Sequence, residues 1–246
     1  MLDLLTQPFM VRALLAALIA AVTSAVIGCF TVLRGLSTMG AATAHASLAG
    51  ALIAFALGFD PLIGAALLSL FFALVTAYSG EHERMDVVLG VSFGFSAALA
   101  ALALAMTREY TVTAYTFLVG EVLGVTDDEL AMLASMSFAT LMMVFLFYKE
   151  FKYVTFDREA AEAMGLRADV YHYLMVVLIA LTTVVELRVV GSILAVVLLV
   201  APAAAAYEFS HSVERMITLA VAFSVASSTL GLAASVAFNT PTSPII

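Results

Sequence analysis

Residues 9–33 read FMVRALLAALIAAVTSAVIGCFTVL, an apolar run in which Arg12 is the only charged residue. A helix needs about 20 mostly apolar residues to cross about 30 Å of hydrocarbon. The run therefore predicts a membrane span. The residues before it, 1–8, lack the basic segment that begins a cleaved signal peptide, and the run is too long for the apolar part of one. We expect this first span to be retained.

Seven further apolar runs follow, and the overall composition agrees with them. The chain is 64% hydrophobic and 11% charged, whereas globular domains average about 45–50% and about 25%. Its net charge of −8 offers no basic surface for nucleic acid. We expect an all-α polytopic membrane protein with about eight transmembrane helices in a single domain, residues 1–246. The expected spans are residues 9–33, 40–57, 62–79, 87–106, 130–148, 171–187, 189–207 and 217–238.

Basic residues are distributed unevenly between the loops, and cytoplasmic loops carry the excess of Lys and Arg. The loops after the odd-numbered spans hold the larger set, so we place these loops in the cytoplasm and both termini outside. The outer loops then carry an acidic rim that either attracts cations or a basic partner or simply solvates the loop ends. The cytoplasmic set is Arg34, Arg84, Lys149, Lys152, Arg158, Arg167 and Arg215; the outer set is Arg12, Arg108 and Arg188; the rim is Asp60, Glu109, Glu121, Asp127, Asp128 and Glu129.

Several features bear on how the helices pack. Only Arg188 separates the sixth and seventh spans, which must form either a helical hairpin or one broken helix. Pro202 removes a backbone hydrogen bond and bends the seventh span, and the alanines at 203–206 let another helix approach closely. The Gly90-x-x-x-Gly94 pattern in the fourth span has the same meaning.

Residues 155–166 read TFDREAAEAMGL and predict a short helix outside the membrane. Asp157 is a suitable N-cap, and Gly165 is a suitable residue to end the helix. The apolar side chains of Ala160, Ala163 and Met164 fall on one face. Such a face either docks into a groove on another protein or packs on the chain's own bundle.

Two of the ionisable residues inside the expected spans are candidate site residues. His45 is about 12 Å from the cytoplasmic boundary of its span, and ionisable residues at such depth usually face the bundle interior or a cavity. Its imidazole is a possible metal ligand, or simply a hydrogen-bonding partner of a neighbouring helix. Glu186, near the outer end of the sixth span, is either an interfacial partner of Arg188 or a cation ligand at the mouth of a pathway.

The chain carries no recognisable enzyme motif. The patterns G-x-S-x-G and H-E-x-x-H and paired cysteines are absent, and the single cysteine, Cys29, excludes an internal disulfide. The phosphate-binding pattern G-x-x-x-x-G-K-[ST] is also absent. We therefore expect no catalytic residues, no bound cofactor and no ATP hydrolysis by this chain; a pump would take its energy from a partner or an ion gradient.

Five segments, taken together and in order, resemble the permease subunits of bacterial and archaeal ABC transporters that import zinc, manganese or iron(II), the ABC-3 type metal permeases. The resemblance runs from about residue 33 to about residue 242. The segments are RGLSTMG at 34–40 followed by His45-Ala46 and Gly50, RMDVVLG at 84–90, LVGEVLGV at 118–125, residues 156–166, and residues 190–206 with VGS at their start and APAAAA at their end.

This resemblance implies a type II ABC importer-like fold in a prokaryotic cell membrane, with a divalent metal ion as the substrate. A permease homodimer is expected to enclose one pathway in the lipid bilayer, with cytoplasmic ABC ATPase subunits below and an extracytoplasmic solute-binding protein outside. His45 is then a residue of the metal pathway, and we keep Glu186 as a second candidate. The implied ATPase-coupling helix comprises Asp157, Arg158, Glu159, Ala160, Ala161, Glu162, Ala163, Met164, Gly165 and Leu166.

One position departs from the family pattern. The family's second span usually reads Gly-Asp-Ala-x-Ser-His, whereas residues 40–45 read GAATAH. The family's Asp and His resemble a membrane metal site, since residues four apart share a helix face; this chain has Ala41 in place of the Asp. Manganese prefers oxygen ligands and zinc accepts imidazole better, so the loss slightly favours zinc. It also leaves open a metal chelate or other small solute, and Thr43 or Glu186 as a compensating ligand.

Three alternatives belong to other classes. A stand-alone secondary transporter needs several intramembrane ionisable groups for ion coupling, and His45 is the only one well inside a span. An intramembrane enzyme needs a converging nucleophile and base or a metal cluster. A structural subunit of a larger membrane complex needs neither. Purification with or without an ATPase subunit separates the importer from all three.

Overall fold

The computed structural model describes residues 7–82, 84–106, 120, 122–238, 240, 242–243 and 245–246, and these are helical apart from turns and short links. Arg108, Glu109 and Glu121, which belong to the expected outer loops, lie outside the described residues, as do residues 118 and 119 of the segment 118–125.

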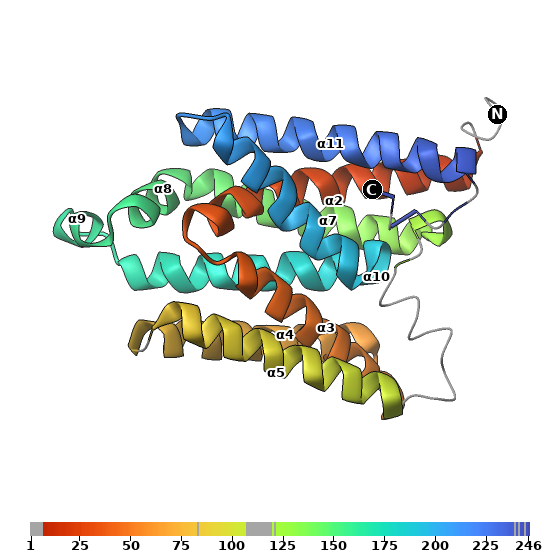
Figure 1. The fold of residues 1–246 in the computed structure, drawn as a ribbon, viewed down its shortest axis with the longest axis horizontal. Coiled ribbons are helices and arrows are strands. Elements are labelled where there is room, and N and C mark those ends of the chain that lie inside the picture. Colours follow the sequence, from red (N-terminus) through yellow and green to blue (C-terminus); the bar gives the residue numbers. More distant parts are fainter. Residues whose placement is uncertain are drawn as a thin grey trace.

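Within the described residues, seven helices are long and apolar enough to cross a membrane. One of them, α10, has 41 residues and is interrupted at Gly191, whose φ of 83° and ψ of 164° are not helical. Figure 1 shows its second half folding back across the bundle, so α10 crosses twice. The eight crossings are confirmed, and the sixth and seventh form the hairpin. The seven helices are α2 (Pro8–Leu33), α3 (Ser37–Ala56), α4 (Pro61–His82), α5 (Met85–Met106), α7 (Asp127–Leu146), α10 (Ala168–Glu208) and α11 (Val213–Phe238).

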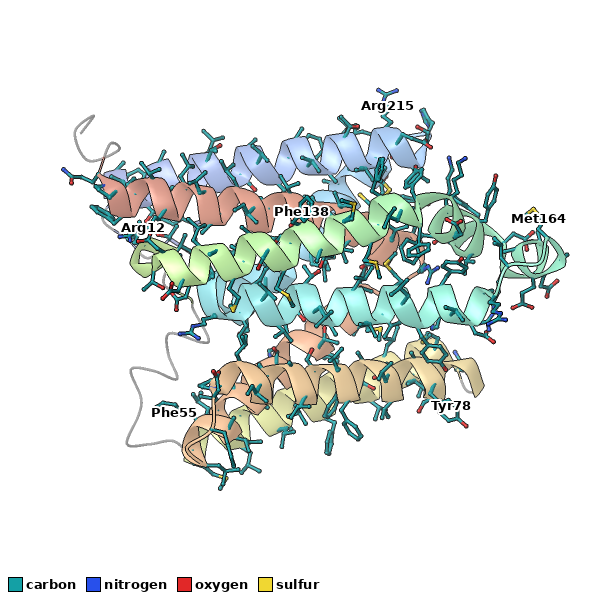
Figure 2. The ribbon with its side chains drawn as sticks, turned by 180° about the vertical axis from the view of Figure 1, so that it is seen from behind. Arg12, Phe55, Tyr78, Phe138, Met164 and Arg215 are labelled. Atoms are coloured by element: carbon teal, nitrogen blue, oxygen red, sulfur yellow. The ribbon has the colours of Figure 1, made fainter. Side chains whose placement is uncertain are left out.

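The start of α2 and the C-terminus lie at one end of the bundle, and the short helices α8 (Tyr148–Phe156) and α9 (Arg158–Ala163) lie at the other (Figure 1). Figure 2 likewise places Arg215 and Met164 near one end and Arg12 at the opposite end. The alternation of the helices therefore puts the larger basic set at the α9 end. By the positive-inside rule this is the cytoplasmic end.

Glycines allow two of the closest helix crossings. A Cβ atom on Gly28 of α2 would lie 1.8 Å from the backbone oxygen of Leu199, in the second half of α10. Gly50 of α3 and Gly64 of α4 face each other in the same way, because a Cβ on Gly50 would lie 2.2 Å from the Gly64 oxygen. Backbone contact of this kind is typical of membrane bundles, where small residues let helices approach.

The Gly-x-x-x-Gly pattern of α5 does not serve this purpose within the part of the chain that the structure describes. Gly90 and Gly94 carry no close neighbour: a Cβ on either would meet no atom of the described structure within 4 Å. Among the described residues this pattern brings no second helix close, so its expected role in helix contact stays a prediction. The alanine expectation for the seventh span is confirmed at Ala203, which packs at the Gly28 crossing.

The break in α10 is covered by two other segments. The interruption removes Val190 from the regular helix, and the hydroxyl of Ser243 donates to its carbonyl oxygen at 3.1 Å. Gly120, with φ of 80°, lies so close that a Cβ there would be 2.2 Å from the same oxygen. A carbonyl freed in a low-dielectric region needs such a donor, so the break is a supported element of the fold.

Candidate functional site

His45 lies near the middle of α3 and is half-buried. Its ring lies against Phe93 of α5, with centroids 5.5 Å apart and planes inclined by 59°. Ala41, one turn earlier, is also half-buried, as expected for a residue on the same face. The face of α3 that carries Ala41 and His45 is therefore half-buried on the single chain, at the junction of α3 and α5.

Thr43 does not lie beside His45. Its hydroxyl is within 3.0 Å of the Met39 carbonyl oxygen and within 2.9 Å of that of Gly40, and it accepts from Thr183 of α10 at 3.4 Å. Thr43 therefore faces α10, whereas His45 faces α5. It does not take the place of the carboxylate missing at Ala41.

Glu186 is fully buried where α10 packs on α2. Both carboxylate oxygens contact the hydroxyl of Ser24, at 2.6 and 2.7 Å, and the side chain is 1% exposed. The expected pairing with Arg188 is wrong, because the Nε atom of Arg188 donates to Glu129 at 2.7 Å instead. Sequence patterns did not single out Ser24, since one serine in an alanine-rich span has no signature of its own.

A small polar cavity borders Glu186. Its volume is about 10 Å³, enough for about one water molecule. Hydroxyl side chains of α2, α7 and α10 contribute to its lining, at Thr23, Ser137, Thr140 and Thr182. Glu186 thus belongs to the junction of α2, α7 and α10, and the structure does not bring it beside His45.

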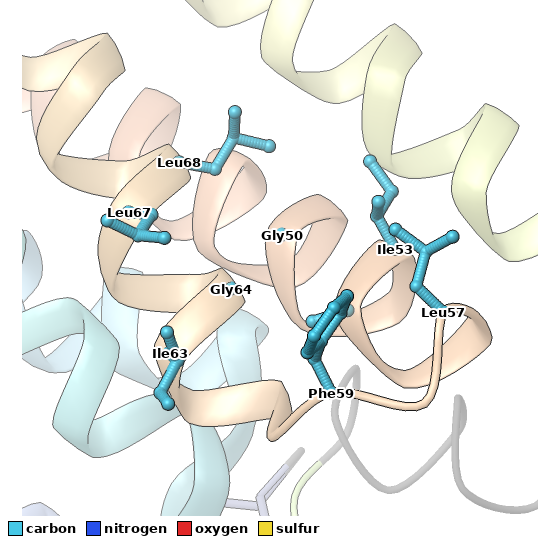
Figure 3. Close-up of a pocket in the computed structure, with 9 residues that line it drawn as sticks. Gly50, Ile53, Leu57, Phe59, Ile63, Gly64, Leu67 and Leu68 are labelled. Atoms are coloured by element: carbon cyan, nitrogen blue, oxygen red, sulfur yellow. The ribbon is translucent and has the colours of Figure 1, made fainter.

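The described residues contain no group of three or more His, Cys, Asp or Glu side chains placed to hold a metal ion. A much larger cavity, of about 470 Å³, lies between the ends of α3 and α4 (Figure 3). Its walls are apolar, among them Ile53, Phe59 and Leu67. They offer no side-chain ligand to a metal ion, and His45, the candidate ligand from the sequence, lies outside this cavity against Phe93 of α5.

The outer end carries the acidic rim, partly neutralised by the chain itself. Arg12 pairs with Asp127 at 3.1 Å, as Arg188 does with Glu129. Glu129 also completes a capping box with Thr126: its carboxylate accepts from the Thr126 backbone at 3.0 Å, and Thr126 accepts from the Glu129 backbone at 3.3 Å. This arrangement starts α7 at the outer end.

The predicted cytoplasmic helix is present as α9. The carboxylate of Asp157 accepts from the Ala160 backbone at 2.9 Å, which confirms the N-cap. Gly165 has φ of 87° and ends the helix: its N–H donates to Glu162, and that of Leu166 donates to Ala161. These two bonds form a Schellman motif, so α9 is closed at both ends by its own residues.

One face of α9 packs on the bundle, and another face is exposed. Ala161 is buried against Val154 of α8 and Ala168 of α10. Ala160, Ala163 and Met164 are exposed, and Met164 projects from the end of the molecule (Figure 2). The apolar face predicted to dock on another protein is therefore available on a helix that is anchored from behind.

Comparison with known proteins agrees with this arrangement. The model of the ABC 3 transport family matches residues 6–246. The chain is 36% identical to the manganese transport system membrane protein MntC of Listeria monocytogenes, over 96% of this chain and 85% of that protein. It is 35% identical to the chelated iron transport system membrane protein YfeD of Yersinia pestis, over 97% of this chain and 81% of that protein.

Solved structures share the fold. PsaBC from Streptococcus pneumoniae, in complex with Fab, is 32% identical and superposes with a TM-score of 0.87, over 99% of this chain and 88% of that chain. A metal-chelate type ABC transporter in an inward-facing conformation gives 16% identity and a TM-score of 0.76, over 95% and 80% of the two chains. This confirms the type II importer-like fold. The chain belongs to the ABC 3 transport family and is a multi-pass membrane permease subunit of an ABC transporter.

Proposed function

We propose that the chain is the permease of an importer that moves a divalent manganese or iron ion into the cytoplasm, with ATP hydrolysed by a separate subunit. The observation that carries this proposal is the family match along nearly the whole chain, with relatives named for manganese and for chelated iron at similar identity. The leaning toward zinc, drawn from the missing carboxylate at Ala41, stays a prediction that neither of these two relatives supports.

His45 is the proposed contact between the protein and the ion. Its imidazole is a side-chain type that binds divalent metals, and it lies half-buried near the middle of α3. In a homodimer built around this face of α3, two imidazoles converge on one pathway. Such a site needs only weak affinity, because an ion that binds too tightly does not leave. Loss of the family's carboxylate weakens it further.

The proposed coupling runs through α9. ATP binding draws two ATPase subunits together, and each subunit holds the exposed face of Ala160, Ala163 and Met164. Because Ala161 is buried against α8 and α10, a displacement of α9 is carried to the spans that follow. An extracytoplasmic solute-binding protein delivers the ion at the outer end, where Asp60 and Asp128 add to the negative charge.

Uptake by the purified complex in proteoliposomes tests the proposal. The permease, its ATPase and its binding protein are supplied with manganese, iron(II), zinc or cobalt, with and without ATP. We expect saturable, ATP-dependent uptake of manganese or iron, strongly reduced by His45→Ala. Thr43→Ala, on the opposite face of the same helix, is the matched control. Normal uptake by a correctly assembled His45→Ala complex would exclude His45 from the pathway.

A metal chelate is the second candidate, favoured by the missing carboxylate and by the relative named for chelated iron. It predicts no uptake of any bare ion while the ATPase stays bound and active. Zinc uptake in preference to manganese and iron would instead support the ligand argument from Ala41.

We also propose that Glu186 is a second residue that contacts the ion on the metal pathway. An ion would reach it through the water-sized cavity and displace the hydroxyl of Ser24. Glu186→Gln retains the size and hydrogen-bonding capacity of the side chain but removes its charge. Lost uptake with an unchanged melting temperature supports this role, whereas lowered stability with normal uptake by the folded fraction identifies Glu186 as a structural contact only.

A further inference from the structure

A second polar cavity lies at the base of α9, apart from His45 and Glu186. Its volume is about 260 Å³. Its polar lining comes from Arg34, Thr155, Arg158 and His172, and apolar side chains such as Leu36 complete the walls. Three of the four polar residues are basic, and Arg158 at the rim is the first residue of α9.

Arg34 is the residue that makes this cavity unusual. Its Nε atom donates to the Thr155 hydroxyl at 2.9 Å, and that hydroxyl in turn donates to the Phe151 carbonyl at 2.6 Å. Nη1 and Nη2 of Arg34 are buried and have no acceptor in the part of the chain that the structure describes. A buried charged donor without a partner is unfavourable.

The neighbouring arginine, unlike Arg34, is paired with carboxylates. Arg158 pairs with Glu162 at 3.2 Å and also contacts the carboxylate of Asp169. Burial, and then repulsion from Arg158, lower the pKa of Arg34 to about 10, so the guanidinium still carries its charge at neutral pH. The cavity therefore holds one buried positive charge that the described residues do not balance.

We propose that this cavity receives a carboxylate side chain of the ATPase subunit, which pairs with Nη1 and Nη2 of Arg34 when the ATPase docks on α9. The proposal rests on the proposed function. Two adjacent N–H groups of a guanidinium match the two oxygens of a carboxylate, and the apolar wall at Leu36 suits the methylene groups of an acidic side chain. The rim at Arg158 favours a docked protein over a lipid, because α9 extends away from the spans (Figure 1).

Binding of the ATPase to the permease in nanodiscs tests this pairing. The variants are Arg34→Gln, which removes the charge, and Arg34→Lys, which retains it without the planar pair of donors. Arg215→Gln is the matched control, since it removes the same charge from an exposed site at the same end. We expect Arg34→Gln to weaken binding about tenfold or more, Arg34→Lys to lie between, and Arg215→Gln to stay near wild type.

The melting temperature of the permease without its ATPase is the second readout. An unpaired buried charge does not stabilise the isolated subunit, so Arg34→Gln is expected to melt at or above the wild-type temperature. A melting temperature lowered by Arg34→Gln, with wild-type ATPase affinity of the folded fraction, would identify Arg34 as a structural residue and overturn the proposal.

Four other results would also overturn it. If the Arg34→Gln permease binds the ATPase with wild-type affinity, the proposed pairing is refuted but the proposed function is not. If the wild-type permease binds no ATPase, the proposed function is refuted as well. Glu81 and Glu83 are acidic residues that shortly precede Arg84 in the sequence; if Glu81→Gln or Glu83→Gln reproduces the loss of affinity, the carboxylate belongs to this chain. If inorganic phosphate or phosphatidylglycerol vesicles stabilise wild type but not Arg34→Gln, while ATPase affinity is unchanged, the cavity binds a phosphate group instead.

Discussion

Gly28 lies where α2 crosses the second half of α10, and its replacement by alanine tests how closely the two helices pack. A Cβ there would lie 1.8 Å from the Leu199 oxygen, whereas ordinary contact begins at 3.4 Å, so the helices must separate by about 1.6 Å. Overpacking of this kind costs about 1–3 kcal/mol. For a chain of this size, 1 kcal/mol corresponds to about 2–4 °C, so the melting temperature should fall by roughly 2–12 °C.

The chain contains its own reporter for this measurement. Cys29 is the single cysteine and is fully buried, so a thiol-reactive fluorogenic dye labels it only when the bundle opens. Gly94→Ala is the matched control, because a Cβ there meets nothing within 4 Å of the described structure. Alanine is favoured over glycine in a helix by about 0.5–1 kcal/mol, so this variant should melt at or slightly above the wild-type temperature.

Two results would refute the reasoning. If Gly28→Ala melts at the wild-type temperature, the crossing has room for a methyl group and the close approach is not part of the native packing. If Gly94→Ala falls as far as Gly28→Ala, the loss does not come from contact between α2 and α10.

Further predictions concern single contacts. Thr126→Ala removes the cap of α7 and should cost about 1 kcal/mol, or about 2–4 °C by the same dye assay, while Thr126→Ser should retain wild-type stability. Ser24→Ala leaves the buried carboxyl of Glu186 without its donor and should destabilise by about 1–3 kcal/mol, more than Glu186→Gln; the reverse order would show that the hydrogen bond matters little. Met164→Glu changes only the exposed face of α9 and should abolish ATPase copurification with an unchanged melting temperature. Retained copurification would mean that the ATPase docks elsewhere.

The local features of α9 could be predicted from residue types because each acts within a few positions along the chain. Asp157 caps the helix through Ala160 three residues later, and Gly165 ends it through a positive φ. Both depend on backbone geometry that neighbouring residues set by themselves. The exposure of Met164 followed from the same pattern.

The partners of Glu186 and Arg188 could not be predicted in this way. The two residues are two positions apart in the sequence, yet Glu186 accepts a hydrogen bond from Ser24, whereas Arg188 donates one to Glu129. Hydropathy shows that a segment is a helix in a membrane, but the rotation of that helix about its axis depends on which neighbours it packs against. The unbalanced charge of Arg34 became visible for the same reason, once α8 was placed beside the end of α2.

Sequence alone determined the membrane class, the eight crossings, the placement of the basic loops and the capped cytoplasmic helix, because apolar length, loop charge and capping are local properties. Only the tertiary structure decided which glycines lie at close helix crossings. Gly90 and Gly94 form a Gly-x-x-x-Gly pattern yet meet no atom of the described structure within 4 Å, whereas Gly28, Gly50 and Gly64 belong to no Gly-x-x-x-Gly pattern and meet another backbone. Close approach is a property of two helices at their crossing point, and a single chain segment does not specify where that point lies.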